Sequence, residues 1–148
     1  MINDSIKITG DVKIDIIGAD GVVKDSREIK NLVVTTGKNY IASRMKDATA
    51  TAMSHMELGT GTTAAAIGDT TLQTALAGSR VTLTSTTVTT NSVAYVASFP
   101  AGTGTGAVTE AGVFNAASAG TLLCRTVFSV VNKGANDAMS ITWTITVS

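Results

Sequence analysis

The stretch MSITWTITVS, residues 139–148, decides the fold class, because apolar and hydroxyl side chains alternate through it without a break. Successive side chains of a β-strand point to opposite faces, so this pattern predicts a strand with one face in a core and the other coated with hydroxyl groups. The predicted core face carries Met139, Ile141, Trp143, Ile145 and Val147.

The same alternation predicts two further hairpins. Near the beginning of the sequence, apolar residues alternate with charged ones, and a glycine-bounded turn at 18–21 then leads to a returning strand that includes Ile29 and Leu32. Residues 93–99 repeat the pattern, and we expect them to form a hairpin with residues 81–84 across a turn near residue 90. The predicted core residues are Val12, Ile14, Ile16, Val93, Tyr95, Ala97 and Phe99.

Residues 108–134 are predicted to form another hairpin, with its turn at 115–120. By alternation, one face of its second strand carries Leu122, Cys124, Thr126, Phe128 and Val130. The small residues of this hairpin, Gly112 among them, suggest close approach of neighbouring strands or subunits.

Helical spacing occurs in one segment. Tyr40, Ile41 and Met45 follow that spacing, and a threonine before them suits a cap, so we expect one short helix near 36–47. Residues 70–78, TTLQTALAG, are expected to add at most a helical turn.

The composition agrees with an all-β protein. The 148 residues include 25 Thr, 14 Gly and 12 Ser against one Pro, a balance that favours strands joined by short turns. The length suits one domain. We therefore predict a single β-sandwich or jelly-roll domain over 1–148, in which 1–34 forms a charged hairpin.

Charge and reactive residues exclude several functions. The 11 basic and 11 acidic side chains cancel, which disfavours nucleic acid and anionic membranes as partners. His55 and Cys124 are each the only residue of their kind, and Glu110 and Asp137 are isolated carboxylates, so we expect no enzyme, metal or cofactor. The glycines of GTGTT, residues 59–63, could place amides around an anion, but a tight turn is the simpler interpretation. No signal peptide is recognised, and we expect a soluble protein made in a cytoplasm.

Two segments carry a resemblance to a known class. MELGTGTTAAAIGDTTLQTAL, residues 56–76, and the segment from Tyr95 to Ser148, with its TEAGVF, LLCRTVF and WTIT pieces, resemble small virion structural proteins of tailed bacteriophages. Proteins that look like this are described as capsid decoration (cement) proteins, as tail fibre proteins or as virion components without an assigned place. The first 50 residues carry none of the pattern.

The resemblance implies a role in the virion. Phage cement proteins with jelly-roll domains sit as dimers or trimers across contacts between subunits of the major capsid protein, and we expect that role here. The alternative is a tail fibre or baseplate component of the phage tail. A carbohydrate-binding sandwich is a third interpretation, disfavoured because Tyr40, Tyr95 and Trp143 are scattered along the chain.

The interface is predicted in the charged hairpin. Lys24, Arg27 and Lys30 could fix the position of the protein on a capsid or on a sister subunit. The alternative is an ordinary solvated face, since exposed charges usually contribute little to binding or stability.

Overall fold

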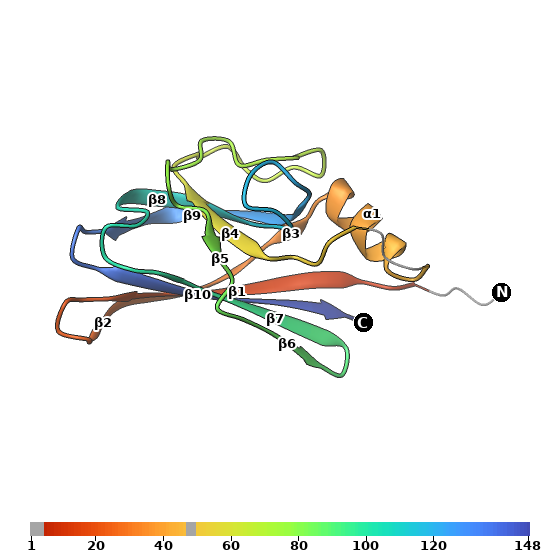
Figure 1. Ribbon diagram of the computed structural model, residues 1–148, viewed down its shortest axis with the longest axis horizontal. Helices are drawn as coiled ribbons and strands as arrows, with labels where there is room; N and C mark the ends of the chain where they lie inside the picture. The colour runs from red at the N-terminus through yellow and green to blue at the C-terminus, as the bar shows by residue number, and fades with distance from the viewer. Residues whose placement is uncertain (1–4, 47–49) are drawn as a thin grey trace.

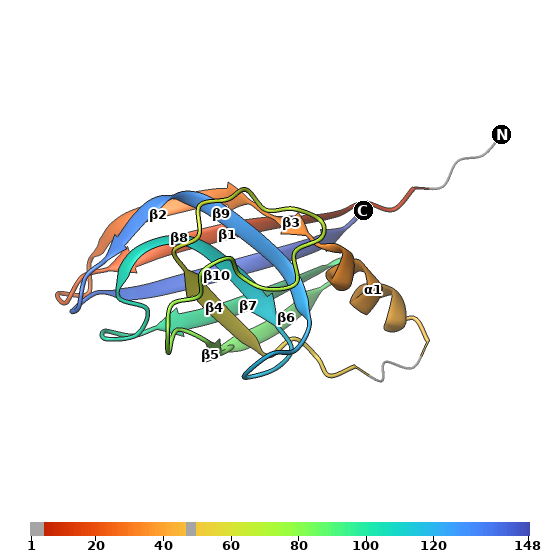
Figure 2. The ribbon, with the colours of Figure 1, turned by 90° about the horizontal axis from the view of Figure 1, so that it is seen from above.

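A computed structural model describes residues 5–46 and 50–148 as a sandwich of two antiparallel sheets (Figures 1 and 2). Sheet A has the strand order β2-β1-β10-β7-β6, and sheet B has the order β3-β9-β8-β4-β5. The protein is therefore all-β, as predicted. The elements are β1 (Ile8–Ile17), β2 (Val23–Lys30), β3 (Leu32–Val33), α1 (Thr35–Ser43), β4 (His55–Gly59), β5 (Val81–Thr82), β6 (Ser85–Thr89), β7 (Ser92–Phe99), β8 (Gly106–Phe114), β9 (Leu122–Lys133) and β10 (Ala138–Val147).

The two most regular strands of the sequence, β1 and β10, pair at the centre of sheet A without a break in register from Ile8 to Ile17. Their alternate apolar residues face sheet B, as the alternation predicts, and Ile14, Ile141 and Trp143 are 0% exposed. Val147 departs from this pattern and is 38% exposed, because it lies at the open end of the sandwich. One core cluster joins residues of both sheets.

The predicted N-terminal hairpin is formed by β1 and β2, with the 18–21 turn closed by a bond from the Gly21 amide to the Gly18 carbonyl. Residues 1–4 of the predicted range 1–34 lie outside the described residues. The chain then leaves sheet A, because Leu32 pairs with Arg125 in sheet B. Leu32 is thus part of a crossover between the sheets and not of the hairpin.

The predicted hairpin over 108–134 is also present, as β8 and β9, but the face of β9 is only partly as expected. Cys124, Thr126 and Phe128 are buried on the core side. Leu122 packs instead in a small cluster with Phe114 on the opposite face, and Val130 is 46% exposed. The reason is two irregularities in the β8–β9 register, one near each end, that shift the alternation by one residue.

Two predictions on the middle of the chain were wrong in part or in full. The predicted hairpin across the turn at 90 and 91 is present, but its first strand is β6 and not 81–84. β5 joins β4 in sheet B, and of residues 81–84 only Thr84 bonds to β7, through its amide and the Val96 carbonyl. Residues 70–78 contain no helical turn, and Ala75 forms an isolated bridge with Gly59 instead.

The single predicted helix is present as α1, between Thr35 and Ser43, and it is shorter than the expected 36–47; Asp47 lies outside the described residues. Val34 occupies the N-cap position and no side chain caps the helix, so the expected threonine cap is wrong. The Thr36 hydroxyl donates to the Leu122 carbonyl, 2.8 Å away. Gly37 is buried against the backbone of Leu123, where a side chain would not fit.

The segment 60–78 forms a further layer. In both ribbon views it lies over the outer side of sheet B (Figures 1 and 2). Leu72 packs beneath it with Val34, Phe114 and Leu122. Sheet B is therefore covered on both faces, whereas the outer face of sheet A faces solvent.

Candidate assembly surfaces and a buried charge cluster

The outer face of sheet A is divided into a neutral half and a charged half. The paired residues form rows across the five strands, and each row begins with uncharged side chains, mostly small or hydroxyl ones, on β6, β7 and β10 and ends with charged or polar ones on β1 and β2. Because side chains alternate, every second residue of each strand belongs to this face. Two such rows are Thr87–Ala94–Thr144–Asp11–Lys30 and Ser85–Val96–Thr142–Lys13–Glu28.

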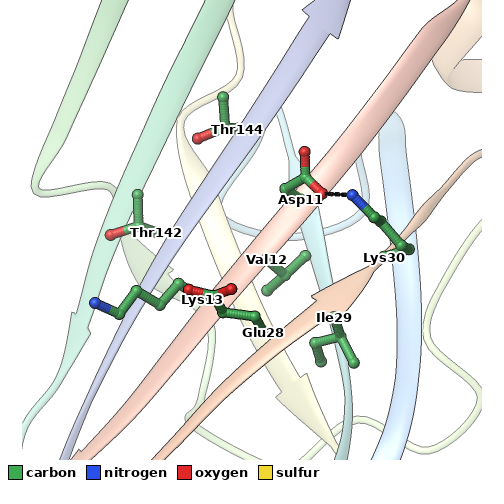
Figure 3. Close-up of a pocket in the computed structure, with 8 residues that line it drawn as sticks. All are labelled: Asp11, Val12, Lys13, Glu28, Ile29, Lys30, Thr142 and Thr144. Carbon is green, nitrogen blue, oxygen red and sulfur yellow. Dashed lines mark hydrogen bonds and ion pairs between the residues drawn. The ribbon is translucent and has the colours of Figure 1, made fainter.

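The charged half of this face carries both signs, with two lysines and three carboxylates. Lys30 forms an ion pair with Asp11, Lys13 lies opposite Glu28, and the Ser26 hydroxyl donates to Asp15 at 2.6 Å. A shallow depression of about 500 Å³ runs over this area (Figure 3). Its lining residues are Asp11, Val12, Lys13, Glu28, Ile29, Lys30, Thr142 and Thr144.

The three predicted interface residues do not form one patch. Lys30 lies on the outer face with Asp11. Arg27 alternates to the other side and donates to the backbone carbonyls of Ser129 and Val130, at 2.7 and 2.9 Å, so it links the edge of sheet A to β9. Lys24 lies beyond the register shift of the hairpin and pairs with Asp137.

A buried ionic cluster, formed by Glu110, Arg125 and Asp69, holds the 60–78 segment on sheet B. Glu110 is 0% exposed, and Arg125 lies beside it on β9 and donates to its Oε2 from Nε at 2.9 Å and from Nη2 at 2.8 Å. The other guanidinium nitrogen, Nη1, lies 2.8 Å from Asp69, and Nη2 also donates to the carbonyl of Thr63 at 3.0 Å. Two points of the segment, Thr63 and Asp69, are thus tied to one arginine.

The segment also binds Glu110 through its backbone. The amides of Gly61 and Thr74 donate to Oε1 at 2.9 and 2.7 Å, and the amide of Gln73 donates to Oε2 at 3.0 Å. Burial on its own would raise the pKa of Glu110, but the bonds from Thr74, Gln73, Arg125 and Gly61 together lower it below the ordinary value. The GTGTT stretch therefore does place an amide on an anion, and that anion is the protein's own carboxylate.

Asp137, in the turn between β9 and β10, is also paired. It receives two bonds from Lys24, at 2.9 and 3.0 Å, and one from the Gly134 amide at 2.9 Å; these contacts lower its pKa. The Lys133 ammonium, on a residue 1% exposed, donates to the carbonyls of Pro100 and Asp137. The description of Glu110 and Asp137 as isolated carboxylates was thus wrong.

The two lone reactive residues occupy structural positions. Cys124 is 0% exposed in the core, and burial raises the pKa of its thiol, which keeps the sulfur protonated and inert. His55 lies on β4, and its Nδ1 is 2.7 Å from the hydroxyl of Ser54. Burial likewise raises the pKa of Tyr95 to about 12.

Comparison of the chain with protein-family models, with curated proteins and with solved structures gave no match. Within residues 5–46 and 50–148, no group of three or more His, Cys, Asp or Glu side chains is arranged to hold a metal ion. No helix in the same part of the chain has the length and hydrophobicity needed to cross a membrane.

Sequence reasoning missed Arg125 as the centre of a cluster, although the signal was present. Three pieces of the resemblance pattern, GDTTL, TEAGVF and LLCRTVF, each contribute one charged residue, namely Asp69, Glu110 and Arg125. A carboxylate or arginine inside an otherwise apolar or small-residue strand is a mark of a buried ion pair.

Proposed function

We propose that this chain is a virion structural protein of a tailed bacteriophage, and that it decorates the head by binding across subunits of the major capsid protein. The resemblance of residues 56–76 and 95–148 to such proteins supports the proposal. So does the fold, because a rigid β-sandwich with one uncovered sheet suits a protein that lies on a surface.

The observation that carries the proposal is the outer face of sheet A. Its neutral half presents hydroxyl and small side chains from three adjacent strands, and its charged half pairs positive with negative groups inside the chain. Such a face carries little net field, so it suits a partner met through shape and hydrogen bonds. Sheet B has no equivalent face, because the 60–78 segment lies over it.

The proposed mechanism is stabilisation by selective binding. A ligand that binds only one state of a two-state assembly favours that state by mass action. A protein that spans several capsid subunits in the geometry of the expanded shell therefore favours the expanded shell. Many copies on one lattice make weak individual contacts sufficient, and the proposal includes no catalytic step.

The first test is the copy number per virion in the phage that encodes this chain, measured by quantitative mass spectrometry against the major capsid protein. Hundreds of copies are expected for a head decoration protein. A few to a few tens would replace this proposal with a tail fibre or baseplate role. Absence from purified particles would refute the virion role.

A second test asks which face binds. T144K places a charge in the neutral half of the outer face, and T62K places the same charge at an exposed position of the 60–78 segment, on the opposite side of the sandwich. Co-sedimentation with particles that lack the protein should be lost for T144K and kept for T62K. Equal binding of both variants would refute the assignment of the face.

The charged hairpin receives a separate test. The triple variant K24A/R27A/K30A should lose particle binding if the hairpin takes part in the interface. R27A alone is the matched control, because Arg27 contacts the chain's own carbonyls. If the folded triple variant binds particles as the wild type does, the charged hairpin takes no part in the interface.

A further inference from the structure

The four sheet edges of the sandwich are protected unequally. An uncovered edge strand offers backbone donors and acceptors to another chain, and proteins usually block it with charge or keep it very short. The β2 edge carries five charged residues between 24 and 30, and β3 and β5 are two residues long each. The remaining edge, β6, is the five-residue run STTVT, which contains neither charge nor proline.

Within the described residues, β6 pairs only with β7, and all five of its residues are exposed. Figure 1 shows it at the lower margin of the ribbon. The β6 edge is thus the unprotected edge of sheet A. Its neutral composition also means that a partner needs no charge of either sign.

The ladder fixes which backbone groups of β6 point outward. Along an antiparallel pair, the backbone amide and carbonyl of every second residue bond to the partner strand. The Val147 amide bonds to the Asn91 carbonyl, so the backbone groups of the odd-numbered residues of β7 bond to β10. The even-numbered residues of β7 then bond to Ser85, Thr87 and Thr89 of β6. The amide and carbonyl groups of Thr86 and Val88 are left on the outer edge.

An apolar groove lies beside this edge. It has a volume of about 420 Å³ between α1 and the ends of β6, β7 and β10, and its lining includes Tyr40, Ile41, Thr86, Val88 and Val147. Val88 is 70% exposed and is among the most exposed large apolar side chains of the described residues. The outward backbone groups and this apolar surface belong to the same residues of β6.

We propose that β6 pairs antiparallel with β6 of a second copy, about a two-fold axis through Thr87, so that two A sheets form one continuous ten-stranded sheet. A strand that meets itself antiparallel satisfies the same backbone groups on both copies, as an isologous two-fold interface requires. In this register Thr86 of each copy lies opposite Val88 of the other. Both valines then pack at the seam between the two grooves.

The second copy fits this edge better than an unrelated peptide does. The hydroxyls of Ser85, Thr87 and Thr89 lie on the outer face, so in the dimer they would lie next to the same hydroxyls of the partner. No charged side chain of either β6 strand would then face a neutral one. The result would double the neutral half of the outer face. The dimer forms without a capsid, so its test is independent of the virion role.

The mass of the protein in solution tests the dimer, measured by sedimentation velocity and by light scattering from micromolar to millimolar concentration. The wild type should weigh twice 15.0 kDa at the upper concentrations. V88K should weaken the dimer at least tenfold. V22K, at a 61% exposed valine in the β1–β2 turn, is the control and should dimerise as the wild type does. Circular dichroism confirms that both variants are folded.

A cross-link tests the register. T87C should oxidise to a disulfide-linked dimer, because residues opposite each other in a non-hydrogen-bonded antiparallel pair bring their Cβ atoms close enough for a disulfide. The native Cys124 is buried and will not compete. S98C, at an exposed position on the outer face of β7, should remain unlinked. A monomeric wild type, a trimer, an unaffected V88K or a T87C that links no faster than S98C would each overturn the proposal.

Discussion

Replacing Glu110 by glutamine tests whether the buried ionic cluster holds the 60–78 segment. The carboxylate accepts bonds from Gly61 and Thr74 on one oxygen and from Gln73 and Arg125 on the other. Glutamine keeps the shape but replaces one acceptor by a donor. If the amide oxygen takes the place of Oε1, the NH₂ group faces the Gln73 amide and the guanidinium, and donors meet donors.

The magnitude follows from burial. Removal of one partner of a buried ion pair costs about 3–5 kcal/mol when the other charge is left uncompensated, and the remaining partner of Arg125, Asp69, offsets only part of this cost because its side chain is 25% exposed. Arg125 is 2% exposed, so water cannot replace the lost carboxylate without opening the segment. For a chain of this length, a change of 1 kcal/mol moves the melting temperature by about 2–4 °C, so E110Q should melt about 6–20 °C lower.

The assay is thermal unfolding for the melting temperature and urea unfolding for the free energy, both followed by the fluorescence of Trp143, the single tryptophan, which is 0% exposed in the core. The control is E28Q on the outer face of β2, whose loss should be below about 1 kcal/mol. Hydrogen exchange should show faster exchange for the amides of Gly61, Gln73 and Thr74. An E110Q variant as stable as E28Q would refute the view that the carboxylate anchors the segment.

The same carboxylate predicts a pH dependence. Because the pKa of Glu110 is lowered on folding, its contribution to stability is complete above the ordinary value of 4.5 and is lost as the pH falls through the lowered pKa. The difference in melting temperature between wild type and E110Q should therefore stay constant from about pH 7 to pH 5 and narrow below about pH 4. A difference that widens in acid would contradict the assignment.

Three further substitutions test other parts of the structure. G37A should lower the melting temperature, because a methyl group at this position meets a backbone carbonyl of β9, even though alanine favours a helix over glycine by about 1 kcal/mol. The control is K38A, at the exposed neighbour, which should leave the melting temperature unchanged or raise it. K24A should raise the pKa of Asp137 toward its ordinary value, measured by NMR titration of the carboxyl, and an unchanged pKa would show that the pair does not persist in solution. G112V should cost about 1–3 kcal/mol by crowding two leucine side chains without altering dimerisation, and a change of oligomer size at unchanged stability would contradict the packing.

The regular strands could be predicted from the sequence because each has one face in the core along its whole length. Ile14 and Trp143, for example, are placed by a period of two that nothing interrupts. The prediction of the β9 face failed at Leu122 and Val130, where register shifts move the alternation by one residue. Such shifts depend on the pairing with β8, which has no local signal in the sequence of β9.

The 60–78 segment could not be predicted for a related reason. Leu72 and Leu76 have helical spacing, but the segment takes its shape from Glu110, which lies more than thirty residues farther along the chain. The pairing of Asp137 with Lys24 spans 113 residues and is equally hidden. In both cases the ordinary preference of charged side chains for the surface suggests solvent exposure, and only the fold brings the partner close.

Several residues of the pattern that suggested a virion protein are therefore internal. The glycines of 59–61, the carboxylate of Glu110 and the guanidinium of Arg125 meet in one buried cluster, where they fix a segment against sheet B. Proteins that share these residues would share the shape of this segment whatever they bind. In the proposed role, recognition would use the uncovered side, with the hydroxyl rows of sheet A and the β6 edge. For that reason T144K and V88K, which leave the buried cluster intact, separate binding and assembly from folding, whereas E110Q does not.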